Sequence, residues 1–210
     1  MAALRAALNN AKENGWVTSD MAWRKPLSPV ENATGRRQGI LDKQQKELLI
    51  SVAQTDIGAY LKGLSLLPFR PGALANLLVS NIDQKSGCLV IKIDKGKNER
   101  RIILPPVTLA FFIDQTKDKL PSAPLFSRAD GAAWNKDSWK KPIKAAVKSA
   151  GLPLSTSAYT LRHTTITELV RSGLNLLSVA QLSGTSVAMI EKHYGHFEAE
   201  HAAKALEKLA

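Results

Sequence analysis

Two short apolar runs, CLVIKID at residues 88–94 and RRIILPP at residues 100–106, flank the polar segment KGKNE at residues 95–99. Such runs on either side of a turn that contains Gly96 predict an antiparallel β-hairpin. Elsewhere apolar residues recur mostly at helical spacing, as after Leu41, where Asp42 is a plausible N-cap. The chain is therefore predicted to be mainly α (α+β), a helical protein with one small antiparallel β-sheet.

Proline, glycine and polar residues separate the helical patterns. Residues 1–14 predict a helix that ends at Gly15, and residues 16–39, which include Trp16 and Trp23, predict a linker or extended arm. The last third of the chain, from Tyr159, alternates helices and turns. Further helices are expected at residues 72–83, 107–120 and 136–152, with a loop at 121–135, and Pro142 must lie in the first turn of its helix or kink it.

The chain is strongly basic. Its 29 lysines and arginines exceed its 18 acidic residues, which gives a formal charge of +11 and a pI near 9.8. This excess favours a polyanionic partner, although a basic protein without such a partner is the alternative. The lone Cys88 excludes an internal disulfide and fits a reducing compartment. Without a long apolar stretch or a signal sequence, we expect a cytoplasmic protein or a fragment of one.

Two patterns indicate surfaces for nucleic acid, each with a simpler explanation. Lys136, Lys140, Lys144 and Lys148 recur every four residues, so they predict a basic stripe that either contacts phosphate or is merely solvated. The segment SVAQLSGTSVAMIEKHY at residues 178–194 has the spacing of a helix-turn-helix around Gly184. Two ordinary packed helices would also produce that spacing.

Two arginines occupy unusual positions. Arg70 lies inside the apolar run LSLLPFRPG, so it either pairs with a buried acid or is held out for a ligand. Arg162, followed by His163, is expected near the start of a helix at residues 158–170. A cation there does not help the helix but would reinforce an anion site, an ordinary surface ion pair being the alternative.

The order of Arg70, a hairpin lysine, YTLRHT at residues 159–164 and GTSVAMIEKHYGH at residues 184–196 resembles the catalytic domain of the tyrosine recombinases, the phage integrase family. The resemblance covers about residues 41–197. It implies that residues 40–210 are the catalytic domain with a C-terminal tail helix. Residues 1–39 are similar to the last helix and linker of the core-binding domain of the family. Most of that domain is absent, so a fragment is expected.

The resemblance assigns roles by position. Arg70 and Arg162 match the catalytic arginines, Tyr194 the nucleophile and Lys95 the hairpin lysine, with Lys97 as a possible substitute. The sequence departs from the common pattern at three positions: Tyr159, where many members have histidine; Thr185, where many have histidine or tryptophan; and Ala73, where an acid is frequent. They leave the general base open. His163 and His196 are candidates for a base, an orienting group or a structural hydrogen bond.

The implied reaction is transesterification at a DNA phosphodiester, which releases a 5′ hydroxyl and leaves a 3′-phosphotyrosyl bond, with no metal or other cofactor. The closely spaced His193, His196 and His201 do not favour a metal site, because no cysteine or well-spaced carboxylate accompanies them.

The implied partner is double-stranded DNA at attachment-type sites, bound by a homo-tetramer that is monomeric when free, in a bacterial cytoplasm. The tail at residues 198–210 would cover its own core or, as the resemblance implies, dock on a neighbouring protomer. The alternative is a non-catalytic DNA-binding module, either a degenerate integrase or a helix-turn-helix regulator.

Overall fold

The computed structural model describes residues 2–28, 39–91, 99–197 and 206–207, and the chain divides into two units, residues 1–38 and 39–210. In the first unit, α1 (Ala2–Glu13) is followed by α2 (Met21–Arg24), a short helix inside the predicted arm. Trp23 is buried, and its Nε1 donates to Oδ1 of Asn9 over 3.0 Å, whereas Trp16 is exposed. The identity of this unit as part of a core-binding domain stays a prediction.

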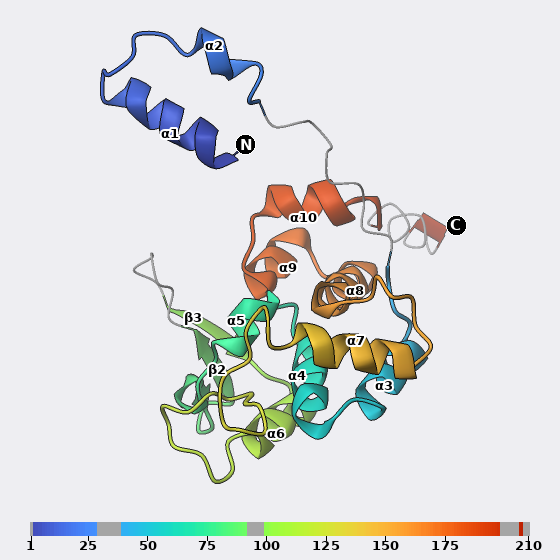
Figure 1. The fold of residues 1–210 in the computed structure, drawn as a ribbon. Coiled ribbons are helices and arrows are strands. Elements are labelled where there is room, and N and C mark those ends of the chain that lie inside the picture. Colours follow the sequence, from blue (N-terminus) through green and yellow to red (C-terminus); the bar gives the residue numbers. More distant parts are fainter. Residues whose placement is uncertain (1, 29–38, 92–98, 198–205, 208–210) are drawn as a thin grey trace. The chain divides into compact units, whose positions relative to one another are not determined.

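The second unit is mainly helical, as predicted, and has one three-stranded antiparallel sheet (Figure 1). Its elements are α3 (Lys43–Ser51), α4 (Thr55–Leu66), α5 (Pro71–Ala75), η1 (Val79–Asn81), β1 (Ile82–Asp83), β2 (Cys88–Ile91), β3 (Arg100–Ile103), α6 (Pro106–Asp114), α7 (Lys140–Ser149), α8 (Ala158–Arg171), α9 (Leu176–Ser183) and α10 (Val187–Tyr194).

The predicted hairpin is present, and a third strand extends it. Strands β2 and β3 pair antiparallel with Leu89 opposite Ile102, while β1 pairs with the other edge of β2. The turn at residues 92–98, which includes Lys95 and Lys97, lies outside the described residues.

The prediction of a helix over residues 72–83 is wrong beyond Ala75. From Leu77 onward, much of the backbone bonds to a distant loop instead of continuing the helix. The amide of Leu125 donates to the carbonyl of Leu77 over 2.8 Å, and the amide of Val79 donates to the carbonyl of Ala123 over 3.0 Å. These tertiary bonds, followed by the pairing of β1 with β2, override the local helical pattern.

Two other helices are shorter than predicted. Helix α6 ends at Asp114. Helix α7 begins only at Lys140. The segment before it is held in a turn, because Oδ1 of Asn135 accepts from the amides of Asp137 and Ser138, both over 2.9 Å. Lys136 therefore precedes the helix instead of lying on it. Pro142 lies in the first turn of α7, as predicted.

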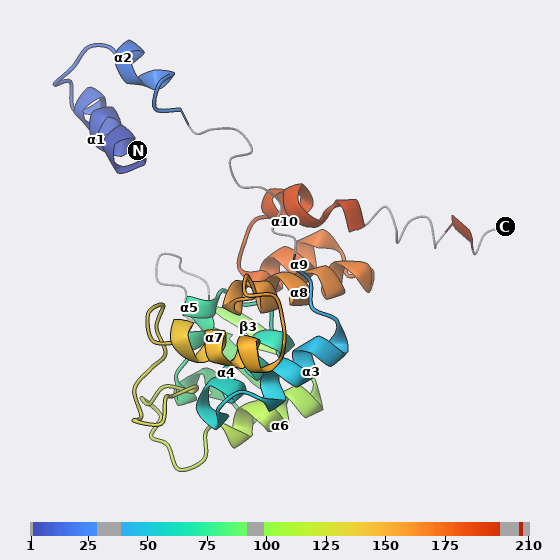
Figure 2. The same cartoon turned by 45° about the vertical axis from the view of Figure 1, so that its right-hand side comes forward.

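The predicted Asp42 cap is confirmed, and a pair of packed helices joined at Gly184 is present, which fits both a helix-turn-helix and two ordinary packed helices. Asp42 caps α3 in a capping box, in which Oδ1 of Asp42 accepts from the Gln45 amide over 2.8 Å. Helices α9 and α10 are joined by Gly184 in the left-handed conformation, with φ of 65°. Helices α8, α9 and α10 pack on one another, and α6 lies at the opposite end of the unit from α10 (Figures 1 and 2).

Helix α8 connects two hydrophobic clusters. Its first turns, with Ala158 and Leu161, belong to a large core built from α3–α7 and the sheet. Its later turns, with Ile166 and Val170, belong to a small cluster whose other buried members among the described residues are Val179, Ala180, Ile190 and Phe197. Arg162 and His163 therefore lie on α8 between the residues of the two clusters.

Candidate active site

Arg162 lies in the second turn of α8 and is buried, with 9% of its surface exposed. Its Nη1 donates to the carbonyl oxygens of Pro68 and of Ser183, the latter over 3.0 Å. Burial, and secondly the charge of Arg70, lower the pKa of Arg162 to about 10. The guanidinium therefore remains charged at neutral pH.

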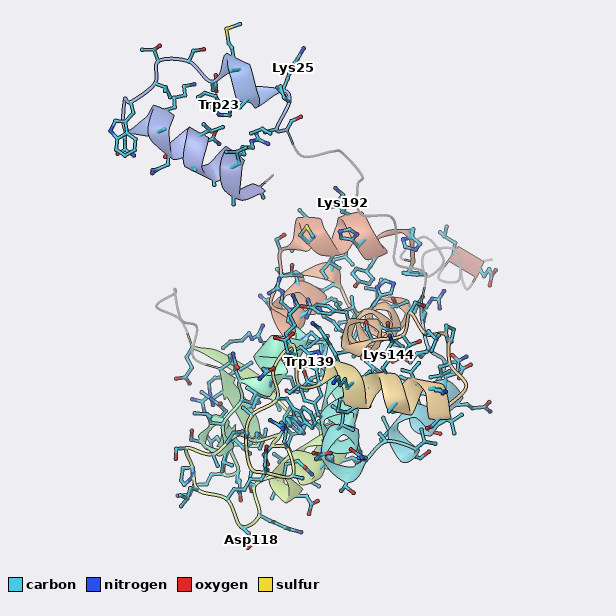
Figure 3. The ribbon with its side chains drawn as sticks, viewed as in Figure 1. Trp23, Lys25, Asp118, Trp139, Lys144 and Lys192 are labelled. Atoms are coloured by element: carbon cyan, nitrogen blue, oxygen red, sulfur yellow. The ribbon has the colours of Figure 1, made fainter. Side chains whose placement is uncertain are left out.

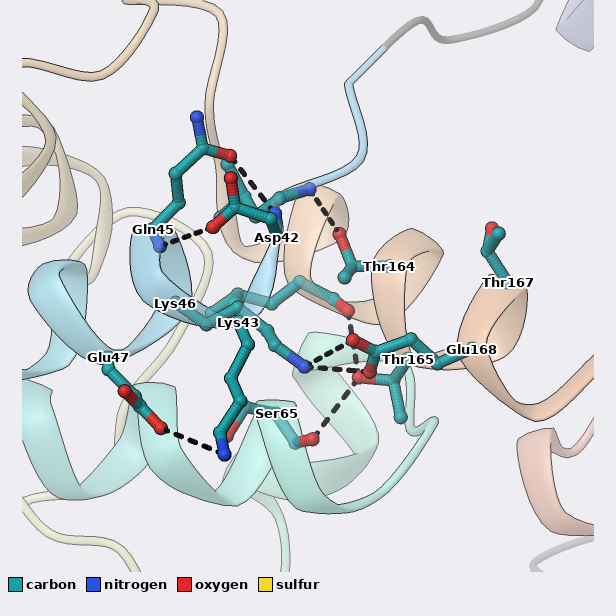
Figure 4. A network of polar contacts seen from close by, with 12 residues as sticks. Asp42, Lys43, Gln45, Lys46, Glu47, Ser65, Thr164, Thr165, Thr167 and Glu168 are labelled. Atoms are coloured by element: carbon teal, nitrogen blue, oxygen red, sulfur yellow. Dashed lines mark hydrogen bonds and ion pairs between the residues drawn. The ribbon is translucent and has the colours of Figure 1, made fainter. Parts of the chain in front are cut away.

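Polar contacts made by threonines fix α8 in place (Figure 4). Oγ1 of Thr164 accepts from the amide of Leu41 over 3.0 Å, and Oγ1 of Thr165 donates to the carbonyl of Leu64 on α4 over 3.1 Å. Further along the helix, Lys46 on α3 forms an ion pair with Glu168 at 2.6 Å. These contacts bind the helix that carries Arg162 to α3 and α4.

Arg70 is exposed and sits just before α5, at its N-cap position. Its Nη1 donates to the carbonyl oxygen of Gly184 over 2.7 Å. The start of α5 is itself held, because the Tyr60 hydroxyl donates to the carbonyl of Pro71 over 2.8 Å. The sequence left open whether Arg70 pairs with a buried acid, and the partner found is a backbone carbonyl.

A third arginine, Arg100 on β3, lies beside these two. Its Nη1 donates to the carbonyl of Gln181 over 2.9 Å, and its charge lowers the pKa of Arg162. Sequence reasoning missed Arg100, although a signal was present. In the two-residue period of a strand, Arg100 shares its face with the buried Ile102, whereas Arg101 shares the exposed face with Ile103.

The three guanidinium groups thus donate to carbonyls in or just after the last turn of α9, at Gln181, Ser183 and Gly184. None of the ion pairs among the described residues involves these arginines. Because neutral carbonyls and not carboxylates hold them, their positive charge is not neutralised. The arrangement is suited to an anion.

Tyr194, the last residue of α10, is half-buried and lies next to His163 of α8. The Tyr194 Oη and the His163 Nδ1 are 2.9 Å apart, within hydrogen-bonding distance. Tyr194 also lies near Arg162, since it raises the pKa of Arg162 against the effect of burial. The structure therefore brings Arg70, the adjacent Arg162 and His163, and Tyr194 into one region, although these three parts of the chain are far apart in sequence.

The remaining predicted residues are placed less centrally. The Thr185 amide donates to the carbonyl of Ala180 over 3.1 Å, and the ring of His196 packs on Phe197 with ring centroids 3.9 Å apart. Ala73 is exposed on α5. Lys95, Lys97, His201 and most of the tail at 198–210 lie outside the described residues. Their roles stay predictions.

Tyr159 is 46% exposed and lines an open hollow of about 580 Å³ between α7 and the start of α8. Lys136, Lys140 and Lys144 line the same hollow, together with the buried Trp139; Figure 3 marks Lys144 on α7 and Trp139 just before it. The predicted lysine stripe therefore has three members at this hollow, although Lys136 precedes the helix. Lys140 also pairs with Asp137 at 2.9 Å.

Within the described ranges, no group of three or more histidine, cysteine, aspartate or glutamate side chains is placed to hold a metal ion. The helices in the same ranges include none with the length and apolar character needed to cross a bilayer.

Residues 40–201 match the family model described as "Phage integrase family". The chain belongs to the phage integrase family. This confirms the resemblance to the family; the matched range includes Arg70, Arg162 and Tyr194, whose catalytic roles stay predictions.

Curated relatives agree with this membership. The chain is 27% identical over 173 residues to tyrosine recombinase XerC of Anoxybacillus flavithermus, which covers 76% of this chain and 57% of the relative. It is 24% identical to tyrosine recombinase XerD of Listeria monocytogenes, covering 93% of this chain and 69% of the relative. The chain thus spans little more than half of the length of the XerC relative.

Solved structures show the same fold. A Tn1549 transposon integrase in complex with a circular intermediate DNA matches with a TM-score of 0.75 at 18% identity, covering 100% of this chain and 77% of that one. The catalytic domain of bacteriophage HP1 integrase matches with a TM-score of 0.59 at 19% identity, covering 80% and 94%. The predicted fold class, a tyrosine recombinase catalytic domain, is confirmed.

Proposed function

We propose that this chain is the catalytic part of a site-specific DNA recombinase that cuts and rejoins DNA through a 3′-phosphotyrosyl intermediate. The observation that carries the proposal is the convergence of two guanidinium groups, from Arg70 and Arg162, on adjacent carbonyls at the end of α9, next to the Tyr194 phenol. Family membership and the names of the XerC and XerD relatives support it.

The arginines bind the scissile phosphate. Negative charge builds up on its non-bridging oxygens in the transition state, and each guanidinium offers a planar fork of donors that stays charged. The Nη1 atom of each arginine is already used, on one carbonyl by Arg70 and on two by Arg162. That contact fixes the orientation of the group while its other nitrogens serve the phosphate. Losing one preorganised donor of this kind costs about 3 kcal/mol, or roughly a hundredfold in rate.

Bond making and proton transfer can be assigned to named groups. The Tyr194 Oη attacks phosphorus, the bond from phosphorus to the 5′ oxygen breaks, and the phenol proton passes to Nδ1 of His163, which lies 2.9 Å from it. The leaving 5′ oxygen takes up a proton, for which Lys95 is the donor proposed from the sequence. The reverse steps with a 5′ hydroxyl of another strand complete the exchange, and the phosphodiester energy is conserved throughout.

Double-stranded DNA at attachment-type sites is the proposed substrate. The Tn1549 transposon integrase, whose fold this chain shares, was solved with DNA, and the net charge of +11 supports a polyanionic partner. Lys136, Lys140 and Lys144 flank the hollow that Tyr159 lines, so the duplex backbone passes along α7 beside the site. Exchange of both strands between two duplexes needs four cuts, and one phenol per cut implies four copies on DNA. The bacterial cytoplasm is the proposed compartment.

The test uses the full-length protein and a nicked duplex carrying its attachment site, from which the short 5′-hydroxyl strand is lost after cleavage. We expect a covalent protein–DNA adduct on denaturing gels that is absent in Tyr194→Phe. Tyr159→Phe is the control and should retain the adduct, because Tyr159 lies at the rim of the site. Salt-sensitive binding without an adduct in the wild type would instead indicate a non-catalytic DNA-binding module.

A further inference from the structure

Arg100 is bound where the two proposed catalytic arginines are bound. It donates to the carbonyl of Gln181, in the last turn of α9, while Arg162 and Arg70 donate to those of Ser183 and Gly184. The carbonyls at the C-terminal end of a helix carry partial negative charge and have no partner within the helix. This end of α9 therefore organises three cations, of which only two have an assigned role.

Arg100 is partly buried, and its surroundings favour a structural task. Its Nε is buried and has no hydrogen-bond partner among the described residues, and its guanidinium lies 5.2 Å from the ring centroid of Phe69. Burial lowers the pKa of Arg100, and the charge of Arg70 lowers it further. Keeping such a group in place costs free energy, because no described carboxylate compensates it.

The contacts of Arg100 lie on both segments that hold Arg70. Phe69 directly precedes Arg70, and Gly184 supplies the carbonyl that Arg70 binds. Gly184 is in the left-handed region, and a Cβ added there would lie 2.8 Å from Nη1 of Arg100. The α9 turn and Arg100 are thus in close contact, at a residue whose left-handed backbone favours glycine.

We propose that Arg100 is a positioning residue for DNA strand cleavage, which clamps the C-terminal turn of α9 so that its carbonyls hold Arg70 and Arg162 on one phosphate. The proposal rests on the proposed recombinase function. It assigns to β3 a task beyond supporting the hairpin turn, because the strand then ties the sheet to the end of α9.

The test compares Arg100→Gln with Arg101→Gln in the full-length protein. Arg101 is adjacent, exposed and paired with Asp83 at 3.2 Å, so it is a matched control for charge and strand position. Single-turnover cleavage of the nicked duplex, DNA affinity and thermal unfolding are measured for each. For Arg100→Gln we expect cleavage slower by about ten- to a hundredfold, as for a small misplacement of catalytic groups, with affinity within about threefold. Arg101→Gln should match the wild type.

A second substrate separates positioning of the arginines from a general weakening of the fold. In a duplex whose scissile phosphate is an uncharged methylphosphonate, the arginines have less charge to stabilise. The ratio of wild-type to Arg100→Gln rates should therefore shrink towards one. An undiminished ratio, or equal rates of wild type and Arg100→Gln on the normal duplex, would overturn the proposal.

Arg100→Lys carries the same test if Arg100→Gln does not fold, because lysine keeps the charge beside Phe69 but lacks the planar fork. We expect a smaller loss in the same direction, and wild-type rates in Arg100→Lys would then overturn the proposal. The wild-type adduct separates the two hypotheses. Its absence would refute the recombinase function, whereas its presence with an unaffected Arg100→Gln would refute only the role of Arg100.

Discussion

Helix α8, which carries Arg162, and helix α10, which carries Tyr194, are anchored very differently. Helix α8 buries eight of its residues, and its threonines bond to α4 and to the chain before α3. Helix α10 buries only Ile190, which belongs to the small second cluster. The helix that carries Arg162, proposed to bind phosphate, is thus built into the large core. The phenol, by contrast, lies at the end of a helix with one buried residue, and its Oη is 2.9 Å from Nδ1 of His163.

Truncating one buried side chain in each hydrophobic cluster tests this difference in anchoring most strongly. Leu49→Ala on α3 and Ile190→Ala on α10 both truncate nearly fully buried residues and should each lower the free energy of unfolding by about 2–5 kcal/mol. Only Ile190→Ala should slow cleavage in the protein that remains folded, because Ile190 lies one turn before Tyr194. Urea unfolding and single-turnover cleavage decide this, and an equal slowing by both variants would contradict the comparison.

The arginines allow a second test. Arg70→Met and Arg162→Met should each slow cleavage by roughly a hundredfold or more, which corresponds to about 3 kcal/mol. Only Arg162→Met should also lower stability, by about 1–3 kcal/mol for each buried carbonyl left unpaired, at Pro68 and Ser183. Arg70 is exposed, so its loss should leave the melting temperature almost unchanged. If both variants lowered the free energy of unfolding equally, the difference in burial between Arg70 and Arg162 would not contribute to stability.

Features that depend on contacts between residues close in sequence could be predicted from the sequence, whereas features that depend on contacts between distant residues could not. The paired strands of the hairpin, the two helices joined at Gly184 and the Asp42 cap follow from local patterns, and all three are present. The segment at 76–83 was mispredicted because its backbone bonds to residues 123–125, which no local pattern reveals. The hydrogen bonds from Arg70, Arg100 and Arg162 to the end of α9 are equally non-local. The sequence therefore indicated Arg70 and Arg162 through their motifs, but it indicated neither Arg100 nor the carbonyls that the three arginines bind.

His163 tests the tyrosine side of the comparison. If its Nδ1 accepts the phenol proton, His163→Gln should slow cleavage by about a hundredfold. The wild-type rate should also fall at acidic pH, where a protonated imidazole cannot accept a proton, and His163→Gln should lose that dependence. Rates measured from acidic to alkaline pH in both proteins provide the check. A variant that is slow but retains the wild-type pH profile would assign His163 to orienting Tyr194 only.

The smallest expected effect concerns the hollow beside α7. Lys144→Gln should weaken DNA binding a few-fold and reduce the slope of log affinity against log salt by about one, as expected for one lost phosphate contact. Lys117→Gln, on the turn after α6 and paired with Asp114 at 2.6 Å, is the control and should change neither quantity. If Lys144→Gln and Lys117→Gln changed the salt dependence of DNA affinity equally, the proposal that the duplex passes along α7 would be wrong.

The most direct measurement is a structure of the full-length protein bound to a duplex with an intact scissile phosphate, using Tyr194→Phe to prevent cleavage. We expect the guanidinium groups of Arg70 and Arg162 to donate to non-bridging oxygens of the same phosphate. The phenyl ring that replaces the phenol in this variant should then lie opposite the 5′ oxygen. Finding Arg70 and Arg162 on different phosphates, or the aromatic ring at position 194 far from the one they share, would contradict this expectation.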